Sequence, residues 1–453
     1  MTRASLIVLT LGILGAGAAR ADDSSDTSAS NDPAVANTQD PARAAVSPIS
    51  IVSGNGVKVG ESSTIYPVFG VESGFVSNVF YTDQAPVSAG LLRVLGELGF
   101  GSISDRRITE ETSPNTAIEP DVPVEHGAFE FKADLYAAYN QYLSGNDNVL
   151  DQGGLEGGAV LRGVINPNQT FFISILDHYD RLIRPTNFES SANINRDVNT
   201  LTIRANYQPA GRKLGGYLYY MHVLDLFEAD TQQFADRFNN TFGFRLSYQW
   251  LPLTRAYVDV SEGVFGGIGS SSEKVSSYPL TAVAGLMTAL SLNLTVNARV
   301  GYQNGFYATG PSYSAVVGGV KVGYRYSPMG RVQFLYSYEH NDSINANFYR
   351  DHAFQIVLQQ DVKPFLIFAR PELRLRQYEG LLPDIMSTMP VRTDVIFAAT
   401  VGARYSFRDW LAATLEYNVV SDQTDFTYSV NGQPQPDPSY VRHEVMAGLR
   451  AAL

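Results

Sequence analysis

The stretch SLNLTVNARVGY, residues 291–302, decides the fold, because its side chains alternate strictly between apolar and polar types. Apolar and aromatic residues hold every second position from Leu292 to Tyr302, and Asn, Thr, Arg and Gly fill the positions between them. Successive side chains of a strand point to opposite faces, so one face is apolar and the other carries Arg299. A strand with a charged face and an apolar face indicates water on one side and an apolar environment on the other.

The same period-2 pattern recurs along most of the chain and predicts an all-β fold. Short turns and longer loops alternate between the strands, which is typical of a transmembrane antiparallel β-barrel of the outer membrane. Two segments, 170–181 and 214–226, alternate poorly, and Pro371 predicts a bulge in its strand. We predict about 18 strands, near residues 64–75, 90–102, 128–142, 155–165, 170–181, 198–208, 214–226, 239–251, 255–265, 278–290, 292–302, 312–326, 331–341, 352–359, 365–378, 394–406, 411–424 and 441–453.

The composition of the 453-residue chain supports a barrel. Tyr (26) and Phe (24) are abundant and charged residues make up only 17 %. The mean hydropathy of −0.09 is too polar for a bundle of membrane helices, but it suits strands that face lipid and water alternately. The net charge of −12 argues against nucleic acid as a partner. The absence of cysteine excludes disulfides and thiolate metal sites.

The chain divides into three predicted parts. Residues 1–21 have the positive, apolar and A-x-A regions of a secretory signal peptide, which predicts export to the Gram-negative outer membrane. Residues 22–63 are mostly small and polar, and we expect a flexible periplasmic segment. Residues 64–453 form the predicted transmembrane β-barrel. Within it, the acidic segment 103–127 lies on the periplasmic side by strand parity, as a plug, a docking segment or an unrecognised hairpin.

Two other architectures compete with the barrel. A soluble β-sandwich or β-helix would have to cover the apolar stripes of all these strands, and no repeat of 20–50 residues suggests a solenoid. A helical membrane protein would use Val275–Ala298, which carries no charge, but that stretch contains Pro279 and alternates with period 2. We therefore favour the barrel.

The charged side chains on the predicted water-facing side of the strands are the candidate functional residues. Either they pair with one another, or they form a pathway for polar or anionic cargo, with Arg370, Arg374 and Arg376 as a basic ladder up one wall. Tyrosines such as Tyr217, Tyr219 and Tyr248 are expected mostly in interfacial girdles, and a minority could stack on sugar rings. The candidate lumen-lining residues are Arg245, Arg299, Arg325, Arg370, Glu372, Arg374, Arg376, Arg404, Glu416 and Arg442, with Lys132, Asp134, Arg162, Arg204, Asp259, Lys321 and Glu444 predicted to face the same way.

The sequence contains no motif for catalysis, cofactor binding or metal binding. We find no G-x-S-x-G, P-loop, G-x-G-x-x-G or H-E-x-x-H pattern, and the six histidines are scattered. We therefore expect no enzyme and no cofactor, although a hidden pair of carboxylates stays open.

The segment 66–82, YPVFGVESGFVSNVFYT, resembles the opening of an outer-membrane β-barrel porin family associated with exopolysaccharide export, the Wzp-type barrels. The resemblance rests on Pro67, Val71 and the run Ser77–Phe80, and it extends over residues 64–453. It implies a conduit for a secreted polysaccharide that works with a periplasmic polysaccharide-export protein and a co-polymerase. It transfers no functional residue.

Three functions follow as hypotheses. The first is an outer-membrane conduit for an exopolysaccharide, with the lipid bilayer, the polysaccharide cargo and the export proteins as partners. The second is a general or anion-preferring diffusion porin. The third is a barrel enzyme that acts on lipid or glycan.

Overall fold

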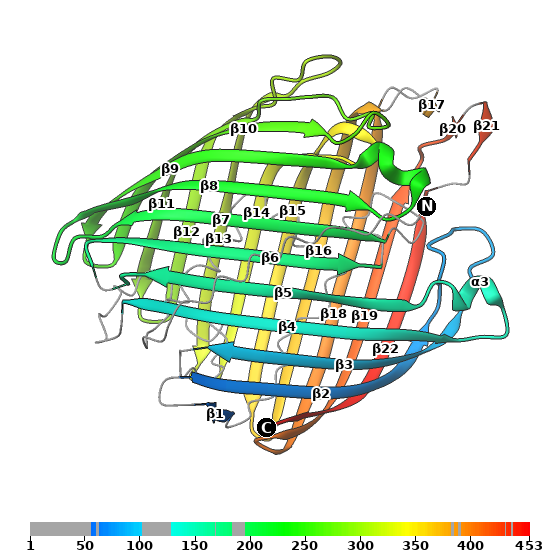
Figure 1. Cartoon of the computed structure of the whole chain (residues 1–453), viewed down its shortest axis with the longest axis horizontal. Coiled ribbons are helices and arrows are strands. Elements are labelled where there is room, and N and C mark those ends of the chain that lie inside the picture. Colours follow the sequence, from blue (N-terminus) through cyan, green and yellow to red (C-terminus); the bar gives the residue numbers. More distant parts are fainter. Residues whose placement is uncertain are drawn as a thin grey trace.

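The computed structural model describes residues 56–59, 63–101, 128–167, 169–183, 195–381, 385–387, 391–430, 432–435 and 438–453. Long antiparallel strands form one large sheet (Figure 1). Its strands are β1 (Val57–Val59), β2 (Ser63–Val76), β3 (Ala89–Gly101), β4 (Phe129–Leu143), β5 (Gly154–Ile165), β6 (Phe171–Leu182), β7 (Arg196–Tyr207), β8 (Leu214–Phe227), β9 (Arg237–Leu251), β10 (Thr254–Gly267), β11 (Leu280–Ser291), β12 (Leu294–Asn304), β13 (Ser314–Ser327), β14 (Gly330–Asp342), β15 (Ala346–Val362), β16 (Phe365–Leu381), β18 (Arg392–Arg408), β19 (Leu411–Thr424) and β22 (Tyr440–Ala452).

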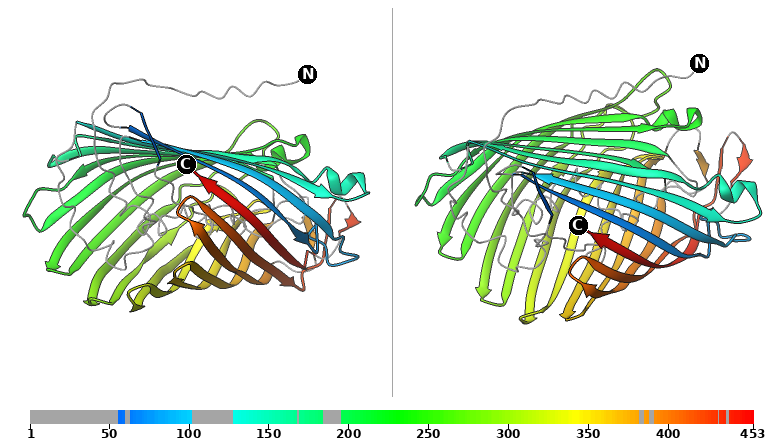
Figure 2. Two further views of the ribbon diagram at one scale, coloured as in Figure 1. Left: turned by 90° about the horizontal axis from the view of Figure 1, so that it is seen from below. Right: turned by 60° about the horizontal axis from the view of Figure 1, so that its bottom comes forward.

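The sheet closes on itself, because its first long strand pairs with its last. Antiparallel pairing between β2 and β22 runs from Val68↔Ala452 to Val76↔Glu444. Eighteen strands make this wall in the described part of the chain, and β1 adds a short strand beside the start of β2. Figure 2 shows β22 lying beside β2 where the barrel closes. The predicted antiparallel β-barrel of about 18 strands is confirmed.

The strand register confirms the period-2 pattern. Arg299 pairs with Gly285 and Gly319, whereas the neighbouring Val300, on the opposite face of β12, is 60 % exposed. The two segments with poor alternation form β6 and β8 at nearly the predicted positions. The largest difference is β15, predicted at 352–359, because its polar outer half does not alternate in hydrophobicity.

Pro371 produces no bulge, contrary to expectation. The β15–β16 register is the same on both sides of it, from Gln355↔Glu372 to Leu358↔Ala369. The pairing lapses only at the intervening positions, while Pro371 stays paired with Ala399 of β18. Since proline lacks an N–H, one ladder is interrupted without an extra residue being inserted.

The two ends of the barrel differ in their connections. At one end, which we call the short-turn end, tight turns join β9 to β10, β11 to β12, β13 to β14, β15 to β16 and β18 to β19. At the other, the long-loop end, most connections are longer and include α3 (Asp147–Leu150), the 3₁₀ helix η4 (Asp230–Ala235) and a small sheet of β17 (Ile385–Ser387), β20 (Tyr428–Val430) and β21 (Gln433–Pro434). Segment 103–127 and residues 1–55 lie outside the described residues.

The outward face of the barrel wall is apolar. Phe244, Val258, Val316 and Leu415 are among the many large apolar side chains there that have no cover. The inward face instead holds buried polar and charged side chains, such as Glu72, Asp259 and Arg376. Hydrophobic side chains outside and charges inside are the reverse of a soluble barrel.

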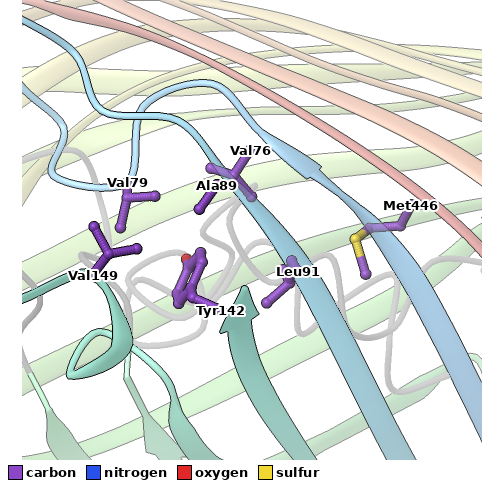
Figure 3. Packing of buried hydrophobic residues seen from close by; sticks show 7 residues of the cluster. All are labelled: Val76, Val79, Ala89, Leu91, Tyr142, Val149 and Met446. Atoms are coloured by element: carbon purple, nitrogen blue, oxygen red, sulfur yellow. The ribbon is translucent and has the colours of Figure 1, made fainter. Parts of the chain in front are cut away.

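A small apolar cluster closes one side of the long-loop end. Val149 of α3 and Val79 of the β2–β3 loop pack over Val76, Leu91 and their neighbours on the inward face (Figure 3). Val79 N–H donates to Val87 C=O within the loop, and the Asn78 amide donates to Val441 C=O of β22 at 3.0 Å. The loop that carries the S-N-V-F motif therefore clamps the first strand to the last.

A network of buried ion pairs crosses the seam between β2 and β22 on the inward face. Glu72 of β2 accepts from Arg93 of β3 at 3.2 Å and from Arg450 of β22. Arg93 also reaches Glu444 of β22 at 3.4 Å. Gly448 makes room for this network, since a Cβ there would lie 2.6 Å from Cγ of Glu72.

The described residues contain no helix that is both long and apolar enough to cross a membrane.

We predict that Glu72→Gln weakens closure of the barrel. The change removes the anion that two buried guanidiniums share, and breaking such a buried pair costs about 3–5 kcal/mol. The measurement is urea unfolding of the detergent-refolded protein, followed by gel mobility without heating. Asp83→Asn, in the exposed part of the β2–β3 loop, is the control. An unfolding midpoint for E72Q equal to that of the wild type would contradict the role of the network.

Candidate functional site

The polarity of the two faces of the wall shows which solvent each face contacts. In a bilayer every backbone N–H and C=O must be paired inside the protein, and the closed sheet satisfies this condition. The apolar outward face matches lipid and the charged inward face matches water.

The protein is a β-barrel of the outer membrane. In such barrels the short turns face the periplasm and the long loops face the cell exterior. The short-turn end is therefore the periplasmic end, and the long-loop end is the extracellular end. The inward face of the wall is the candidate functional site.

The structure places the ten candidate lumen-lining residues on the inward face. Strand pairing fixes this, because directly paired residues share a face: Arg404 with Thr414, Glu416 with Gly402, Arg442 with Val420. The seven further residues predicted to face the same way share it too, as in the pairs Lys132↔Arg162 and Arg245↔Asp259.

Ion pairing divides the predicted basic ladder of β16. Arg376 is 0 % exposed, and its guanidinium holds Asp351 of β15 at 2.7 Å and lies 3.9 Å from the ring centre of Tyr349. Arg374 contacts the same aspartate at 3.0 Å and also Glu372. Of the three arginines of this ladder, Arg370 alone makes no ion pair with the described residues. A continuous ladder of free charges is therefore not formed, because Asp351 of the neighbouring strand neutralises its upper part.

Several of the other candidates are also paired. Arg245 donates to Asp259 at 2.7 Å, and Arg299 contacts Glu339. Arg442 contacts Glu444 at 2.8 Å and lies against the Tyr81 ring, 4.5 Å from its centre. These pairs hold long side chains against the wall and add no net charge to the lumen.

Three inward-facing arginines have no ion pair among the described residues: Arg325 of β13, Arg370 of β16 and Arg404 of β18. The Nε atoms of Arg370 and Arg404 are buried and make no hydrogen bond. Arg370 lies 5.9 Å from the ring centre of Phe368. Arg325 is paired in the register with Arg331, which donates to Gln359 at 2.6 Å. One sector of the wall, β13 to β18, therefore presents three cations that make no ion-pair contact within the described residues, and Asp361 of β15 is the carboxylate that acts on Arg404 from a greater distance.

The inward charges are sorted by height. The periplasmic half of the wall, divided at the strand midpoints, has the basic residues Lys132, Arg162, Arg204, Arg245, Arg255, Lys321, Arg325, Arg331, Arg370, Arg404 and Arg450, against the acidic residues Glu97, Asp134, Asp259, Asp361, Glu372 and Glu416, with Arg299 at the midpoint of β12. The extracellular half has the acidic residues Glu72, Glu156, Asp180, Asp225, Glu339, Asp351, Asp394, Asp422 and Glu444, against the basic residues Arg93, Arg196, Arg237, Arg374, Arg376, Arg392 and Arg442. The described lumen wall is thus basic toward the periplasm and acidic toward the exterior.

Tyr217 and Tyr219 differ from the girdle expectation, because they lie on the inward face of β8. The Arg204 and Arg245 guanidiniums lie 5.1 and 5.5 Å from the Tyr217 ring centre. The Tyr219 hydroxyl donates to Asp259 at 3.2 Å. The poor alternation of β8 concealed this orientation. The other tyrosines assigned to girdles lie on the outward face, namely Tyr248, Tyr302, Tyr324, Tyr326, Tyr336, Tyr338, Tyr405 and Tyr417.

The β14–β15 hairpin reaches across the extracellular mouth. Ile344 at its tip packs against Phe227 of β8 and Ala235 of η4, although five strand pairings separate β9 from β14 along the wall. Arg237 of β9 holds Asp342 at 2.8 Å. Lys274 of the β10–β11 loop bonds the C=O groups of Ser343, Ile344 and Ala346. The mouth above β10–β13 is therefore bridged by polypeptide.

Asp236 supports this bridge from the η4 side. Its carboxylate accepts from Phe227 N–H at 2.8 Å. Burial raises the pKa of Asp236, as does the nearby Asp225, while the Phe227 hydrogen bond opposes the shift.

No group of three or more His, Asp or Glu side chains in the described part of the chain could hold a metal ion.

No family model and no curated protein matches this chain. Among solved structures, it is similar to OccAB4 of Acinetobacter baumannii, with 11% identity, coverage of 86% of this chain and 98% of that one, and a TM-score of 0.42. OccK2 (OpdF) of Pseudomonas aeruginosa has 10% identity, the same coverage and a TM-score of 0.45. The siderophore receptor PirA of Pseudomonas aeruginosa has 7% identity, covers 86% of this chain and 80% of that one, and has a TM-score of 0.39. With so little identity, cargo and partners have to be argued from this chain's own residues.

We predict that Lys274→Met loosens the bridge across the mouth. The lysine ammonium satisfies three buried carbonyls, and leaving buried polar groups unsatisfied costs about 1–3 kcal/mol. Proteinase K should therefore cut the β10–β11 loop of intact cells several-fold faster in the variant.

The matched control is Lys363→Met in the short β15–β16 turn, an exposed lysine at the opposite end of the barrel. Equal cleavage rates in K274M and K363M would show that Lys274 does not hold the bridge.

Proposed function

We propose that this barrel is a diffusion channel that prefers small anions. The observation that carries the proposal is the set of three inward-facing arginines, Arg325, Arg370 and Arg404, for which the described residues provide no ion pair. Fixed charges on a channel wall raise the local concentration of ions of opposite sign. The basic excess of the periplasmic half acts in the same direction.

Ion pairing explains why Arg325, Arg370 and Arg404 affect the charge of the lumen more than the other inward-facing arginines do. An arginine that contacts a carboxylate at about 3 Å presents almost no net field a few ångströms away, because the two charges cancel. The Arg374–Asp351–Arg376 cluster contains Glu372 as well, so it is neutral overall. Selectivity therefore depends on the unpaired cations and on the excess of bases near the periplasmic end.

The acidic extracellular half does not oppose this preference strongly. Four of its carboxylates, those of Glu72, Asp225, Asp351 and Asp394, are held in buried pairs by Arg93, Arg196, Arg237, Arg376 and Arg392. The ion pairs of the acidic half therefore mainly stabilise the wall and contribute little net charge to the lumen.

We predict that the triple variant R325Q/R370Q/R404Q loses much of its anion preference. Glutamine keeps a polar, similarly long side chain and removes only the charge. In a planar bilayer under a KCl gradient, the reversal potential should move toward zero, with the ratio of anion to cation permeability falling at least about twofold. The preference of the wild type should also shrink as salt rises, because screening shortens the range of fixed charges.

The control is Lys213→Gln, in the exposed β7–β8 turn, which removes one positive charge outside the lumen. A cation-selective wild type, or a triple variant that keeps the wild-type reversal potential, would refute an anion channel set by these residues.

Exopolysaccharide export is a second candidate, based on the resemblance at residues 66–82. The structural observation in its favour is the pair of inward-facing tyrosines, Tyr217 and Tyr219, since aromatic faces stack on sugar rings. An exporter should stay closed in the bilayer until its periplasmic export protein binds, and a deletion strain should lose its surface polysaccharide. A channel that conducts alone, in a deletion strain with normal surface polysaccharide, would exclude export.

A further inference from the structure

The outward face of the wall has one unusual sector. On β2–β5, β11–β13, β19 and β22, no outward-facing position is Asp, Glu, Lys or Arg, and on β18 the one such position is Arg408 at the periplasmic end. On β14–β16 such residues occur only at the extracellular ends. On β6 to β10, polar side chains reach further down into the apolar belt. We call this set the outward stripe: Asp177, Asn199, His222, Asn240 and Glu262.

The stripe runs continuously over five neighbouring strands. Asn199 donates to Asp177 at 2.7 Å, and His222 Nδ1 lies 2.9 Å from Asn240 Oδ1. Strand pairing puts His222 directly opposite Asn240, and it puts Glu262 opposite the exposed Phe242. The stripe is therefore an organised surface and not a set of isolated polar residues.

Two carboxylates of the stripe lie within the apolar belt. Val264, which is 42 % exposed, follows Glu262 on the extracellular side, and Val258 precedes it on the periplasmic side. Asp177 lies between the outward-facing Ile173 and Tyr179. Charge on the lipid face of a barrel is unfavourable, and the cost increases with depth. These positions would be costly if lipid alone covered them.

Glu262 makes the clearest case. Its side chain is exposed on the outward face, and its carboxylate has no hydrogen bond or ion pair within the described part of the chain. Large apolar side chains flank the stripe, among them Leu218, which is 64 % exposed. An apolar surface with a few polar groups at its centre is typical of a protein–protein interface.

We propose that the outward stripe is the contact surface for a second copy of this chain, in a two-fold dimer whose axis runs along the membrane normal near β8. In that arrangement β10 of one copy faces β6 of the other. Glu262 then approaches the outward face of β6, where the Arg181 guanidinium lies, held by Glu228 of its own chain at 2.6 Å. The surface contains acidic acceptors (Asp177, Asp197 and Glu262) and hydrogen-bond donors (Arg181, Asn199 and Asn240), so polar groups of one copy can pair with those of the other. This inference does not rest on the proposed channel function.

Cysteine cross-linking in the native outer membrane tests the dimer, because the chain has no cysteine of its own. Leu218→Cys places a thiol on β8, next to the proposed axis, and oxidation should give a disulfide-linked dimer. Val300→Cys, similarly exposed on β12 in another sector, is the matched control and should stay monomeric. No dimer from L218C, or equal dimer from V300C, would overturn the proposal.

A second variant tests the role of the carboxylate. Glu262→Leu should weaken dimerisation about tenfold in detergent, as measured by analytical ultracentrifugation. Conductance per barrel should be unchanged, since Glu262 faces away from the lumen. If E262L dimerises as well as the wild type, or if L218C links to another protein or the mass indicates a higher ring, the two-fold dimer through this stripe is wrong.

Discussion

The structure depends on one constraint, which is that a sheet inside a bilayer can leave no edge unpaired. The seam between β2 and β22 is where this condition is met, and buried ion pairs cross it. Glu72, Arg93, Glu444 and Arg450 link three strands by buried ion pairs. Asn78 adds a bond to Val441 C=O at the extracellular end of the seam. The motif behind the family resemblance thus has a structural role as a clamp.

Closure also determines what the inward charges can do. Strands that alternate must send every second side chain inward, so a large barrel collects many charges in one lumen. Most of them are neutralised by partners on the next strand or the one after, as Arg376 is by Asp351. What is left after pairing is a basic periplasmic half with Arg325, Arg370 and Arg404. Under the proposed channel function, selectivity depends on this remainder rather than on the total number of charges.

The sequence predicted the architecture well because the barrel depends on a local signal. Alternation from Leu292 to Tyr302 needs only the order of residues within one strand, and the same holds for the inward placement of Arg404 or Glu416. Ion pairing between side chains is harder to predict, because it depends on the register between neighbouring strands. Nothing near Arg376 in the sequence reveals Asp351, which lies on the preceding strand. A ladder of free arginines was therefore expected where the register produces a neutral cluster.

The incorrect assignments of side chains to a face of the wall also arose because the sequence does not reveal strand register. Where alternation is poor, as in β6 and β8, the sequence could not fix the face of each side chain. Tyr217 and Tyr219 were therefore assigned to the lipid interface, and Asp177 was not recognised as outward-facing. Pairing with β5, β7 and β9 settles both strands, because one residue of known orientation fixes the rest.

Pro371 gives the wall a local asymmetry. The pairing of β16 with β15 lapses beside it, while the pairing with β18 continues. At this height the sheet is joined on one side only, so a small separation of β15 from β16 would disrupt fewer bonds than anywhere else along that pair. The neighbouring residue is Arg370, one of the cations without a carboxylate partner. In the channel that we propose, a separation of the two strands at this point would move the Arg370 charge, so the elasticity of the sheet would affect which ions pass.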